Sequence, residues 1–362
     1  MVYFSNMNDK QISDILIHWY EVNRRNLPWR ETTDPYLIWI SEIILQQTRV
    51  VQGLDYFYRF TRRFPDVRSL AEADEDEVMK YWQGLGYYSR ARNLHTAARQ
   101  IMNQFGGVFP RTREEVLSLK GIGDYTAAAI CSFAYRLPYA TVDGNVYRVL
   151  ARLFDIDLPI DSGEGKKYFT ELAQSLLDTR RPDLFNQSMM EFGALQCVPK
   201  SPDCLHCPLN DKCRALASGQ VERLPVKAGK TVVKPRYFNY LHVHARGETL
   251  LSKRTGNDIW RNLYEFPLIE TERPLTFGEL QQTEEFQHLF HDIEKVEIIR
   301  EVVAKKHVLS HRVIYAVFYE IRVDVFSPEM EKYLRVKDAN VEDYAVSRLV
   351  QFYLETKESL LF

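Results

Sequence analysis

Four cysteines stand close together near the middle of the chain, in "CVPKSPDCLHCPLNDKC". Cys197, Cys204, Cys207 and Cys213 have the spacing C-x6-C-x2-C-x5-C. Four thiolates in one short loop can close a tetrahedral zinc site or hold an iron–sulfur cluster, and the spacing alone favours zinc. A disulfide is disfavoured, because we expect this chain in a reducing cytosol. The fifth cysteine, Cys131, is predicted to be a small buried apolar residue.

Two carboxyl groups differ from the ordinary acidic residues of a protein surface. Glu42 lies in "YLIWISEIILQQ", a predicted helix that is apolar nearly all round, and poor solvation favours the protonated acid. Asp143 in "TVDGNVYRVL" begins a predicted helix, where free N–H groups and the helix dipole favour the carboxylate. Such a pair can cleave glycosidic bonds. Two structural alternatives stay open: an N-cap for Asp143, which the sequence alone favours, and an arginine partner for Glu42.

Two glycines, Gly121 and Gly123, separate two predicted helices in "LKGIGDYTAAAI". Glycine costs about 1 kcal/mol relative to alanine inside a helix, so the pattern predicts a tight hairpin. A hairpin of this kind exposes successive N–H groups at a helix start, and these groups can bind phosphate. The formal net charge of −2 means that DNA binding would need such local donors rather than a basic surface. A purely structural turn is the alternative.

The hairpin, the later "VDGN" and the cysteine loop together resemble the helix-hairpin-helix DNA glycosylases that carry an iron–sulfur cluster. Within that group, "LPWR", "SEIILQQTRV", "QGLGYYSRARNLH" and "NQSMMEFGALQC" are similar to the MutY family of adenine DNA glycosylases. The resemblance covers nearly the whole chain. It implies that the cysteines hold a 4Fe–4S cluster rather than zinc. It also implies a partner, double-stranded DNA with adenine mispaired with 8-oxoguanine or guanine, from which the adenine is removed.

The resemblance assigns roles to four residues that would carry the chemistry. Glu42 matches the general acid that protonates the adenine ring, and Asp143 matches the residue that stabilises the positively charged sugar. Asn145 matches a supporting residue of the active site. Tyr125 stands where the related endonuclease III enzymes have a lysine nucleophile, so no Schiff base with the sugar can form. The resemblance therefore implies a monofunctional glycosylase.

Five further residues match positions that bind the adenine or the DNA around it. Arg25, Trp29 and Glu191 match the adenine pocket. Gln47 and Tyr87 match residues that fill the base stack when the adenine is flipped out of the duplex. Without the resemblance, core packing of the aromatic residues and a solvated face for the polar ones would be the favoured interpretations.

The last third of the chain contains a second set of matching motifs. "DIWRNLYEFP" resembles a segment of the Nudix-like C-terminal domain of the family, but the chain has no carboxylate run of the R-E-x-x-E-E kind, which makes nucleotide hydrolysis unexpected. In "HVLSHR", Leu309, Ser310 and His311 match the loop that recognises 8-oxoguanine. Many relatives have phenylalanine where this chain has Leu309, so stacking worth roughly 1–3 kcal/mol per base is lost.

The elements that must position these residues divide the chain into two predicted domains. The first, residues 1–222, is mostly α-helical, with the hairpin at 114–135 and the cysteine loop at 197–213. A linker, 223–236, has glycine, proline and scattered charge but no period. Residues 237–362 form a smaller α+β, Nudix-like domain with strand-like segments such as "RVIYAVFYEIRV" and a helical segment, "FGELQQTEEFQHLF", at residues 277–290.

Composition limits the remaining alternatives. The chain has 362 residues and 45% hydrophobic residues, which indicates a folded protein with two domains. It contains no apolar run long enough to cross a bilayer, and we expect a cytoplasmic, nucleoid-associated bacterial monomer. Two other functions stay open: a glycosylase–lyase acting on oxidised pyrimidines, as in endonuclease III, and a non-catalytic DNA-binding module with structural zinc.

Overall fold

The computed structural model describes residues 9–229, 233–304, 306–309 and 311–358. The chain divides into two compact units: residues 1–72 with 96–229, and residues 73–95 with 230–362. The predicted fold class is confirmed, because the first part of the chain is helical and the last part combines a sheet with helices. None of the described helices is both long enough and apolar enough to span a bilayer.

The helical part follows the amphipathic and capping patterns of the sequence. Asp34 caps its helix by accepting a hydrogen bond from the Tyr36 N–H (2.8 Å), with Pro35 in the first turn. The helices, in chain order, are α1 (Asp9–Asn23), α2 (Pro35–Leu45), α3 (Val50–Arg63), α4 (Val67–Glu72), α5 (Glu75–Trp82), α6 (Ser89–Phe105), α7 (Arg113–Ser118), α8 (Asp124–Tyr135), α9 (Gly144–Phe154), α10 (Gly163–Leu176), α11 (Pro182–Leu195) and α12 (Arg214–Ala217), with short 3-10 turns η1 (Pro28–Arg30) and η2 (Asn210–Lys212).

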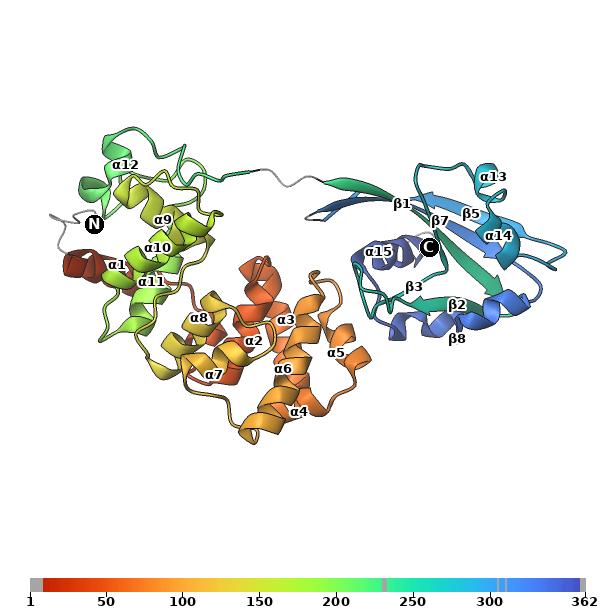
Figure 1. Cartoon of the computed structure of the whole chain (residues 1–362), viewed down its shortest axis with the longest axis horizontal. Coiled ribbons are helices and arrows are strands. Elements are labelled where there is room, and N and C mark those ends of the chain that lie inside the picture. Colours follow the sequence, from red (N-terminus) through yellow and green to blue (C-terminus); the bar gives the residue numbers. More distant parts are fainter. Residues whose placement is uncertain (1–8, 230–232, 305, 310, 359–362) are drawn as a thin grey trace. The chain divides into compact units, whose positions relative to one another are not determined.

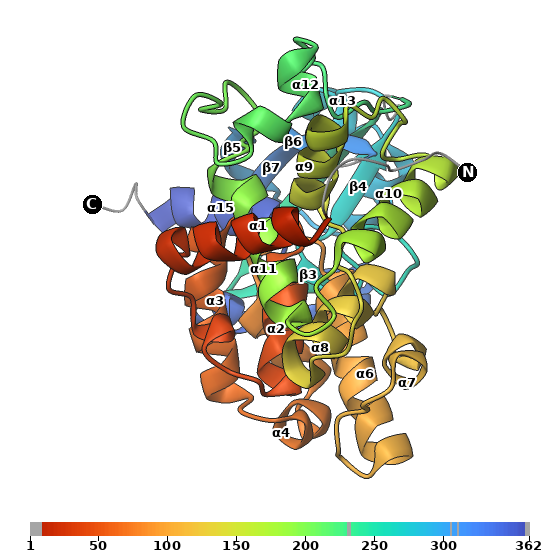
Figure 2. The ribbon, with the colours of Figure 1, turned by 90° about the vertical axis from the view of Figure 1, so that its left-hand side faces the viewer.

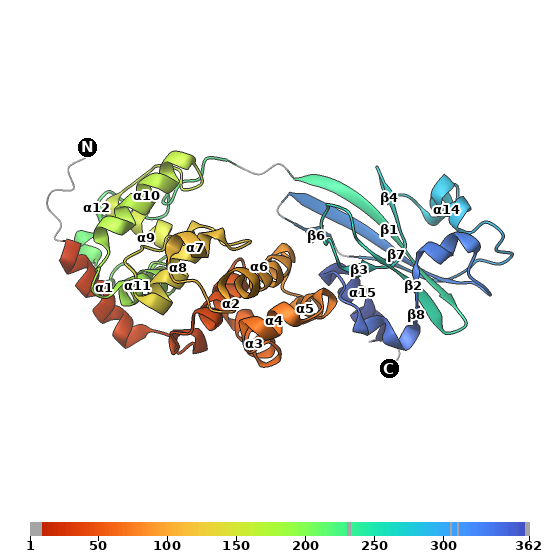
Figure 3. The same cartoon turned by 60° about the horizontal axis from the view of Figure 1, so that its bottom comes forward.

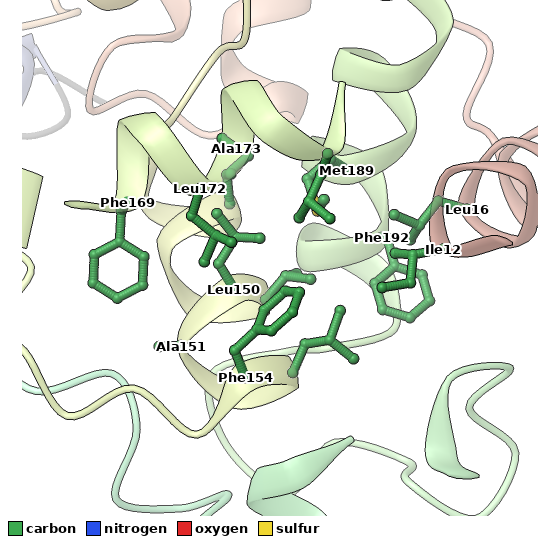
Figure 4. Close-up of a cluster of buried hydrophobic side chains, with 14 of the residues drawn as sticks. Ile12, Leu16, Leu150, Ala151, Phe154, Phe169, Leu172, Ala173, Met189 and Phe192 are labelled. Atoms are coloured by element: carbon green, nitrogen blue, oxygen red, sulfur yellow. The ribbon is translucent and has the colours of Figure 1, made fainter. Parts of the chain in front are cut away.

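A hydrophobic core holds α1, α9, α10 and α11 together (Figure 4). Leu16 of α1, Leu150 of α9, Phe169 of α10 and Met189 of α11 are all buried in it. These four helices lie beside one another in Figures 1 and 2. Their packing holds α9 against α11. Asp143 is the N-cap of α9, and Glu191 lies within α11.

The second part of the chain is built on a mixed sheet with the strand order β3-β2-β1-β7-β5, to which β4, β6 and β8 are added at β1, β7 and β2. Its strands are β1 (Lys234–Ala245), β2 (Glu248–Lys253), β3 (Tyr264–Glu265), β4 (Leu268–Thr271), β5 (Glu297–Val303), β6 (His307–Val308), β7 (Arg312–Arg322) and β8 (Leu334–Lys337). Its helices are α13 (Phe277–Leu280), α14 (Glu284–Leu289) and α15 (Arg348–Glu358), with 3-10 turns η3 (Pro328–Lys332) and η4 (Asp338–Asp343).

The long strands β1 and β7 run parallel, side by side, through the middle of this sheet (Figure 3). Their register pairs Lys234 with Arg312 at one end and His244 with Arg322 at the other. Because side chains alternate across a strand, the two faces differ. One face packs against α13 and α14 through buried apolar residues, and the other meets Tyr353 of α15.

Two segments depart from the predicted elements. Residues 277–290, predicted as one helical segment, form the separate short helices α13 and α14, each begun by a threonine cap. Strand β1 begins at Lys234 and so takes in residues 234–236 of the predicted linker. The domain boundaries themselves stay a prediction.

Candidate active site

A cavity of about 420 Å³ in the helical unit gathers all of the residues predicted for the chemistry and for the adenine pocket. Helices α2, α8, α9 and α11 contribute to its walls, together with the loops before η1 and after α2. The predicted residues that line it are Arg25, Trp29, Glu42, Gln47, Tyr125, Asp143, Asn145 and Glu191. The fold therefore brings together residues that are up to about half the chain apart in sequence.

Glu42 projects from α2 into this cavity and is 7% exposed. The Tyr125 hydroxyl donates a hydrogen bond to Glu42 Oε2 (2.8 Å), so a tyrosine rather than an arginine is its hydrogen-bond donor. Burial raises the pKa of Glu42 to about 7; the Tyr125 hydrogen bond acts against this shift, and the nearby Asp143 charge adds to it. A carboxyl group with this pKa can be a proton donor at neutral pH.

Asp143 is the N-cap of α9, as the sequence favoured, and it also faces the cavity. Its Oδ1 accepts hydrogen bonds from the N–H groups of Asn145 (2.9 Å) and Val146 (2.8 Å), and its Oδ2 accepts one from Asn145 Nδ2 (2.7 Å). Burial raises the pKa of Asp143, while these hydrogen bonds and the charge of Arg148 oppose the rise. All three donors point at the carboxylate oxygens, which is the arrangement that the ionised form satisfies.

Glu191 of α11 is fully buried between two arginines. Arg25 and Arg30 each form two hydrogen bonds with its carboxylate, at 2.6–2.9 Å, and the backbone N–H of Arg25 adds a fifth at 2.9 Å. Burial alone would raise the pKa of Glu191, but these hydrogen bonds outweigh it and lower the pKa to about 2. Trp29, between the two arginines in sequence, is buried edge-on against Phe57.

The base of the cavity is connected to the cysteine loop through Arg148 of α9. Its guanidinium donates to the Cys197 carbonyl oxygen (2.7 Å), to Asn145 Oδ1 (2.9 Å) and to the Gly193 carbonyl oxygen (2.6 Å). Since Asn145 in turn donates to Asp143, three consecutive contacts run from Cys197 to the Asp143 carboxylate. A Cβ atom at Gly193 would lie 2.7 Å from Asn145 Cβ, so only glycine allows α11 to approach this closely.

The four cysteines line one small hollow beside α9. All four are free thiols, and each of Cys204, Cys207 and Cys213 is close enough to Cys197 for the charges to interact. Arg152 closes this side by donating to the backbone carbonyl oxygens of Val198 (2.8 Å), Pro199 (3.0 Å) and Leu224 (3.1 Å).

Ligand spacing at the cysteines argues against a single ion. Zn–S bonds of about 2.3 Å in a tetrahedron place the sulfur atoms about 3.8 Å apart. A compact site would place three or more possible metal-ligand atoms within 4.8 Å of one another. Among the described residues, the four cysteines do not form such a group. The hollow therefore fits a larger group with four cysteine ligands better than one zinc ion.

The Gly-Ile-Gly segment forms the turn between α7 and α8, as predicted. Gly121 has φ +81°, a conformation that favours glycine. Gly123 differs: it is the N-cap of α8, its backbone is extended, and an added Cβ would meet no atom within 4 Å. A side chain at position 123 would therefore meet no steric obstacle, so the positive φ of Gly121 is what favours glycine in this turn. Both residues are exposed, which leaves the start of α8 open to a ligand.

The two residues expected to fill the base stack both have positive φ. Gln47 (φ +58°) lies in the loop after α2 and lines the cavity. Tyr87 (φ +45°) belongs to the other compact unit and is 51% exposed. The backbone at both positions thus adopts a conformation that costs energy for a residue with a side chain, which is common at functional sites.

Two of the predicted lesion-recognition residues, Leu309 and His311, lie between β6 and β7. The N–H of Leu309 donates to the Arg312 carbonyl oxygen (2.8 Å), and the N–H of Lys234 donates to the His311 carbonyl oxygen (3.2 Å). Leu309 is half-buried and His311 is exposed. Ser310 lies outside the described residues.

Two residues of the site were missed at the sequence level. Arg30 stands in the quoted "LPWR" but gave no signal of its own, because its partner Glu191 is far away in sequence. Arg148 follows "VDGN" by three positions, and its place one helical turn after Gly144 is the signal that could have identified it.

Two parts of the chain match models of known protein families. Residues 40–175 match the model of the HhH-GPD superfamily base excision DNA repair proteins. Residues 239–356 match the model of the NUDIX domain.

Individual relatives cover larger parts of the chain. An adenine DNA glycosylase of Buchnera aphidicola subsp. Baizongia pistaciae is 33% identical over 307 residues, which are 83% of this chain and 83% of that protein. An adenine DNA glycosylase of Rattus norvegicus is 41% identical over 222 residues, 58% of this chain and 43% of the rat protein. Among solved structures, a thermostable thymine-DNA glycosylase is similar with a TM-score of 0.55 and 30% identity, over 58% of this chain and 97% of that chain.

Proposed function

This chain belongs to the family of adenine DNA glycosylases, and from that premise we propose that it excises adenine mispaired with 8-oxoguanine or guanine without cutting the DNA strand. As a DNA glycosylase, it is a DNA repair enzyme that hydrolyses N-glycosyl bonds, and DNA is its partner. The observation that carries the proposal is the meeting of Glu42, Tyr125 and Asp143 in one enclosed cavity.

The cavity is the proposed adenine pocket. A base in a duplex must be flipped out before its glycosidic bond can be reached, and Gln47, Tyr87 and the α8 turn are proposed to hold the distorted DNA. Glu191 already accepts five hydrogen bonds from Arg25 and Arg30. Its proposed role is therefore to fix the two guanidinium groups, so that their remaining N–H groups can donate to the acceptor nitrogens of adenine.

Glu42 supplies the proton that makes adenine a neutral leaving group. Its pKa of about 7 keeps a large fraction protonated at neutral pH, and the carboxyl group lies inside the cavity that takes the base. The Tyr125 hydroxyl donates to Oε2, which leaves the other carboxyl oxygen to carry the proton to the base. Proton donation of this kind contributes typically about 10²–10⁴-fold to a rate.

Asp143 stabilises the positive charge that develops on the sugar as the bond breaks. The three hydrogen bonds from Asn145 and Val146 fix the carboxylate before the reaction, so little reorganisation is needed when the charge appears. Helix α8 contributes Tyr125 to the cavity wall, and this side chain has no amine that could act as a nucleophile. With no Schiff base to the sugar, the product is an abasic site in an intact strand.

Cys197, Cys204, Cys207 and Cys213 are proposed to hold a 4Fe–4S cluster. When bound, the cluster would tie the loop at 197–213 to the end of α11, which is a structural task. The four free thiols line one hollow, and among the described residues they do not form a group as compact as a single zinc ion requires, which supports this assignment over zinc.

Recognition of the opposite base is proposed for Leu309, Ser310 and His311. 8-Oxoguanine differs from guanine by an added oxygen at C8 and an added hydrogen at N7, so polar side chains can tell the two apart. Leu309 can supply apolar contact but no aromatic stacking.

The test is single-turnover cleavage of three duplexes that differ in one base pair: adenine opposite 8-oxoguanine, adenine opposite guanine, and thymine glycol opposite adenine. We expect release of adenine from the first two, faster from the first, and abasic product that breaks only after alkali. Cleavage of the thymine-glycol strand, with an adduct trapped by borohydride, would replace this proposal with the endonuclease III type of reaction.

A further inference from the structure

A second cluster of metal-ligating side chains lies in the sheet, far along the strands from the recognition turn. His242 and His244 of β1 alternate onto the same face, and the parallel register places Glu320 of β7 opposite His242. One ligand atom of each of these three residues lies within 4.8 Å of the other two. We propose that His242, His244 and Glu320 form a site for a divalent transition metal, best suited to Zn²⁺.

The donor set matches the chemistry of zinc. Two imidazole nitrogens and one carboxylate oxygen are common protein ligands of Zn²⁺, which they bind at about 2.0–2.2 Å. A mixed nitrogen and oxygen set suits zinc better than calcium or magnesium, which prefer oxygen alone. The two imidazole rings already lie 4.0 Å apart at their centroids, so small rotations of the side chains bring the ligand atoms to the distances that a tetrahedral ion requires.

Both histidines have the outer hydrogen-bond partner that metal-binding histidines usually have. Nδ1 of His244 lies 2.9 Å from Asp338 Oδ1, and Nδ1 of His242 lies 2.8 Å from the Tyr353 hydroxyl. These contacts orient the rings. Nε2 of His244 is buried without a hydrogen-bond partner and lies 3.5 Å from Glu320 Oε1. A buried polar atom without a partner costs free energy, and a metal ion at this point would remove that cost.

The proposed metal site is open to solvent, and a positively charged side chain competes for its carboxylate. His244, Glu320 and Asp338 line an open hollow of about 600 Å³, so an ion can enter from solvent and a water molecule can take the fourth position. Arg300 competes for the carboxylate, since its Nε lies 3.3 Å from Glu320 Oε2. That contact uses the oxygen turned away from His244, so the other oxygen, Oε1, remains directed at the histidine.

The alternative is a simple ion pair between a protonated His244 and Glu320, with no metal. It makes a different prediction, because an ion pair of this kind excludes zinc instead of retaining it. The proposal is independent of the glycosylase activity, since all of its residues lie in the sheet of the second unit and none lines the catalytic cavity.

The test uses the full-length chain, prepared anaerobically and equilibrated with micromolar free Zn²⁺, with zinc per chain measured by mass spectrometry. We expect the wild type to hold one zinc more than the variant His242→Gln/His244→Gln, whatever the cysteine loop contains. His291→Gln is the matched control, because His291 is exposed and pairs with Asp292; it should hold as much zinc as the wild type. Equal zinc in the wild type and the double variant would overturn the proposal.

Two further measurements decide the question if the double variant does not fold. Asp338→Asn changes a half-exposed residue and should weaken zinc binding by about 10–100-fold, the usual cost of losing such an outer partner. The zinc absorption edge of the wild type should show nitrogen and oxygen neighbours. Unchanged zinc affinity in Asp338→Asn, or a shell of sulfur alone, contradicts the site.

Discussion

The cavity of the helical unit and the turn that contains Leu309 and His311 hold their residues in opposite ways. In the cavity, Glu191 accepts five hydrogen bonds and Asp143 accepts three, from donors that are buried or partly buried. At the turn, two backbone hydrogen bonds fix the main chain, while the side chain of His311 is exposed. A network of buried contacts fails as a whole when one member is lost. Side chains on an exposed turn can be changed one at a time, so the chemistry should be all-or-none and the recognition adjustable.

The largest effect is expected from the proton donor. Glu42→Gln keeps the shape of the side chain but cannot supply a proton to adenine, so excision should fall by roughly 10²–10⁴-fold. Glu164→Gln, an exposed change at the start of α10, is the control and should react normally. The measurement is the single-turnover rate on the duplex with adenine opposite 8-oxoguanine. A rate within a few-fold of the wild type would remove Glu42 from the mechanism.

The next effect concerns the charge that faces the sugar. Asp143→Asn removes the negative charge and leaves an amide that cannot accept all three hydrogen bonds that now reach the carboxylate. We expect the rate to fall by roughly 10²–10³-fold, as for other preorganised electrostatic contacts. Duplex binding, measured by fluorescence anisotropy, should be largely kept. Loss of binding in parallel with the rate would mean that Asp143 shapes the pocket instead of stabilising the transition state.

A third change tests whether the cavity depends on helix packing. Gly193→Ala places a methyl group 2.7 Å from Asn145 Cβ, so α9 and α11 must separate and the Asn145–Asp143 contact must shift. Displacement of a catalytic group by about 1 Å can cost about 10²-fold in rate. Gly163→Ala is the matched control, because a Cβ there meets nothing within 4 Å. Equal rates for the two variants would show that the cavity tolerates movement of α11.

A smaller effect is expected at the exposed turn. The double variant Ser310→Ala/His311→Ala should leave the excision of adenine opposite guanine unchanged. It should reduce the preference for 8-oxoguanine by about 10–100-fold, because lost hydrogen bonds are worth roughly 1–3 kcal/mol. Leu309→Phe should leave that preference unchanged or increase it through stacking. The measurement is the ratio of rates on the two duplexes. An unchanged ratio in the double variant would assign discrimination to Gln47 and Tyr87 instead.

The smallest effect is a shift in pH dependence. Glu42 acts in its protonated form, so excision should fall as pH rises through its pKa of about 7. The hydrogen bond from Tyr125 lowers that pKa. Tyr125→Phe should therefore raise it and move the falling limb of the pH–rate profile to higher pH. A shift to lower pH would mean that the tyrosine stabilises the protonated acid.

Local signals in the sequence predicted much of the fold and the two carboxyl groups. Apolar residues around Glu42 predicted its burial, and Asp143 at a helix start predicted its cap, because both properties depend on neighbours within one or two turns. The segment at 277–290 shows the limit. Its helical composition gave no sign that Thr283 would begin a new helix.

Contacts between distant segments could not be derived in this way. Glu191 reaches Arg25 and Arg30 across more than 160 positions, and no periodicity encodes that meeting. The family resemblance supplied Arg25 and Glu191 but not Arg30 or Arg148, whose partners are set by helix packing. The pair His242 and His244 looked like ordinary strand residues until the register placed Glu320 beside them.

The parallel pairing of β1 and β7 also limits how the second half of the chain can be exchanged between relatives. Residues Lys234–Arg236 lie opposite Arg312–Ile314, directly beside the turn, and the Lys234 N–H holds the His311 carbonyl oxygen. In a chimera joined at residue 237, where composition suggests that the domain begins, the start of β1 comes from one relative and the turn beside it comes from the other. A junction before residue 230 transfers the turn with the strand that supports it. The start of β1 and the turn should therefore be exchanged together between relatives.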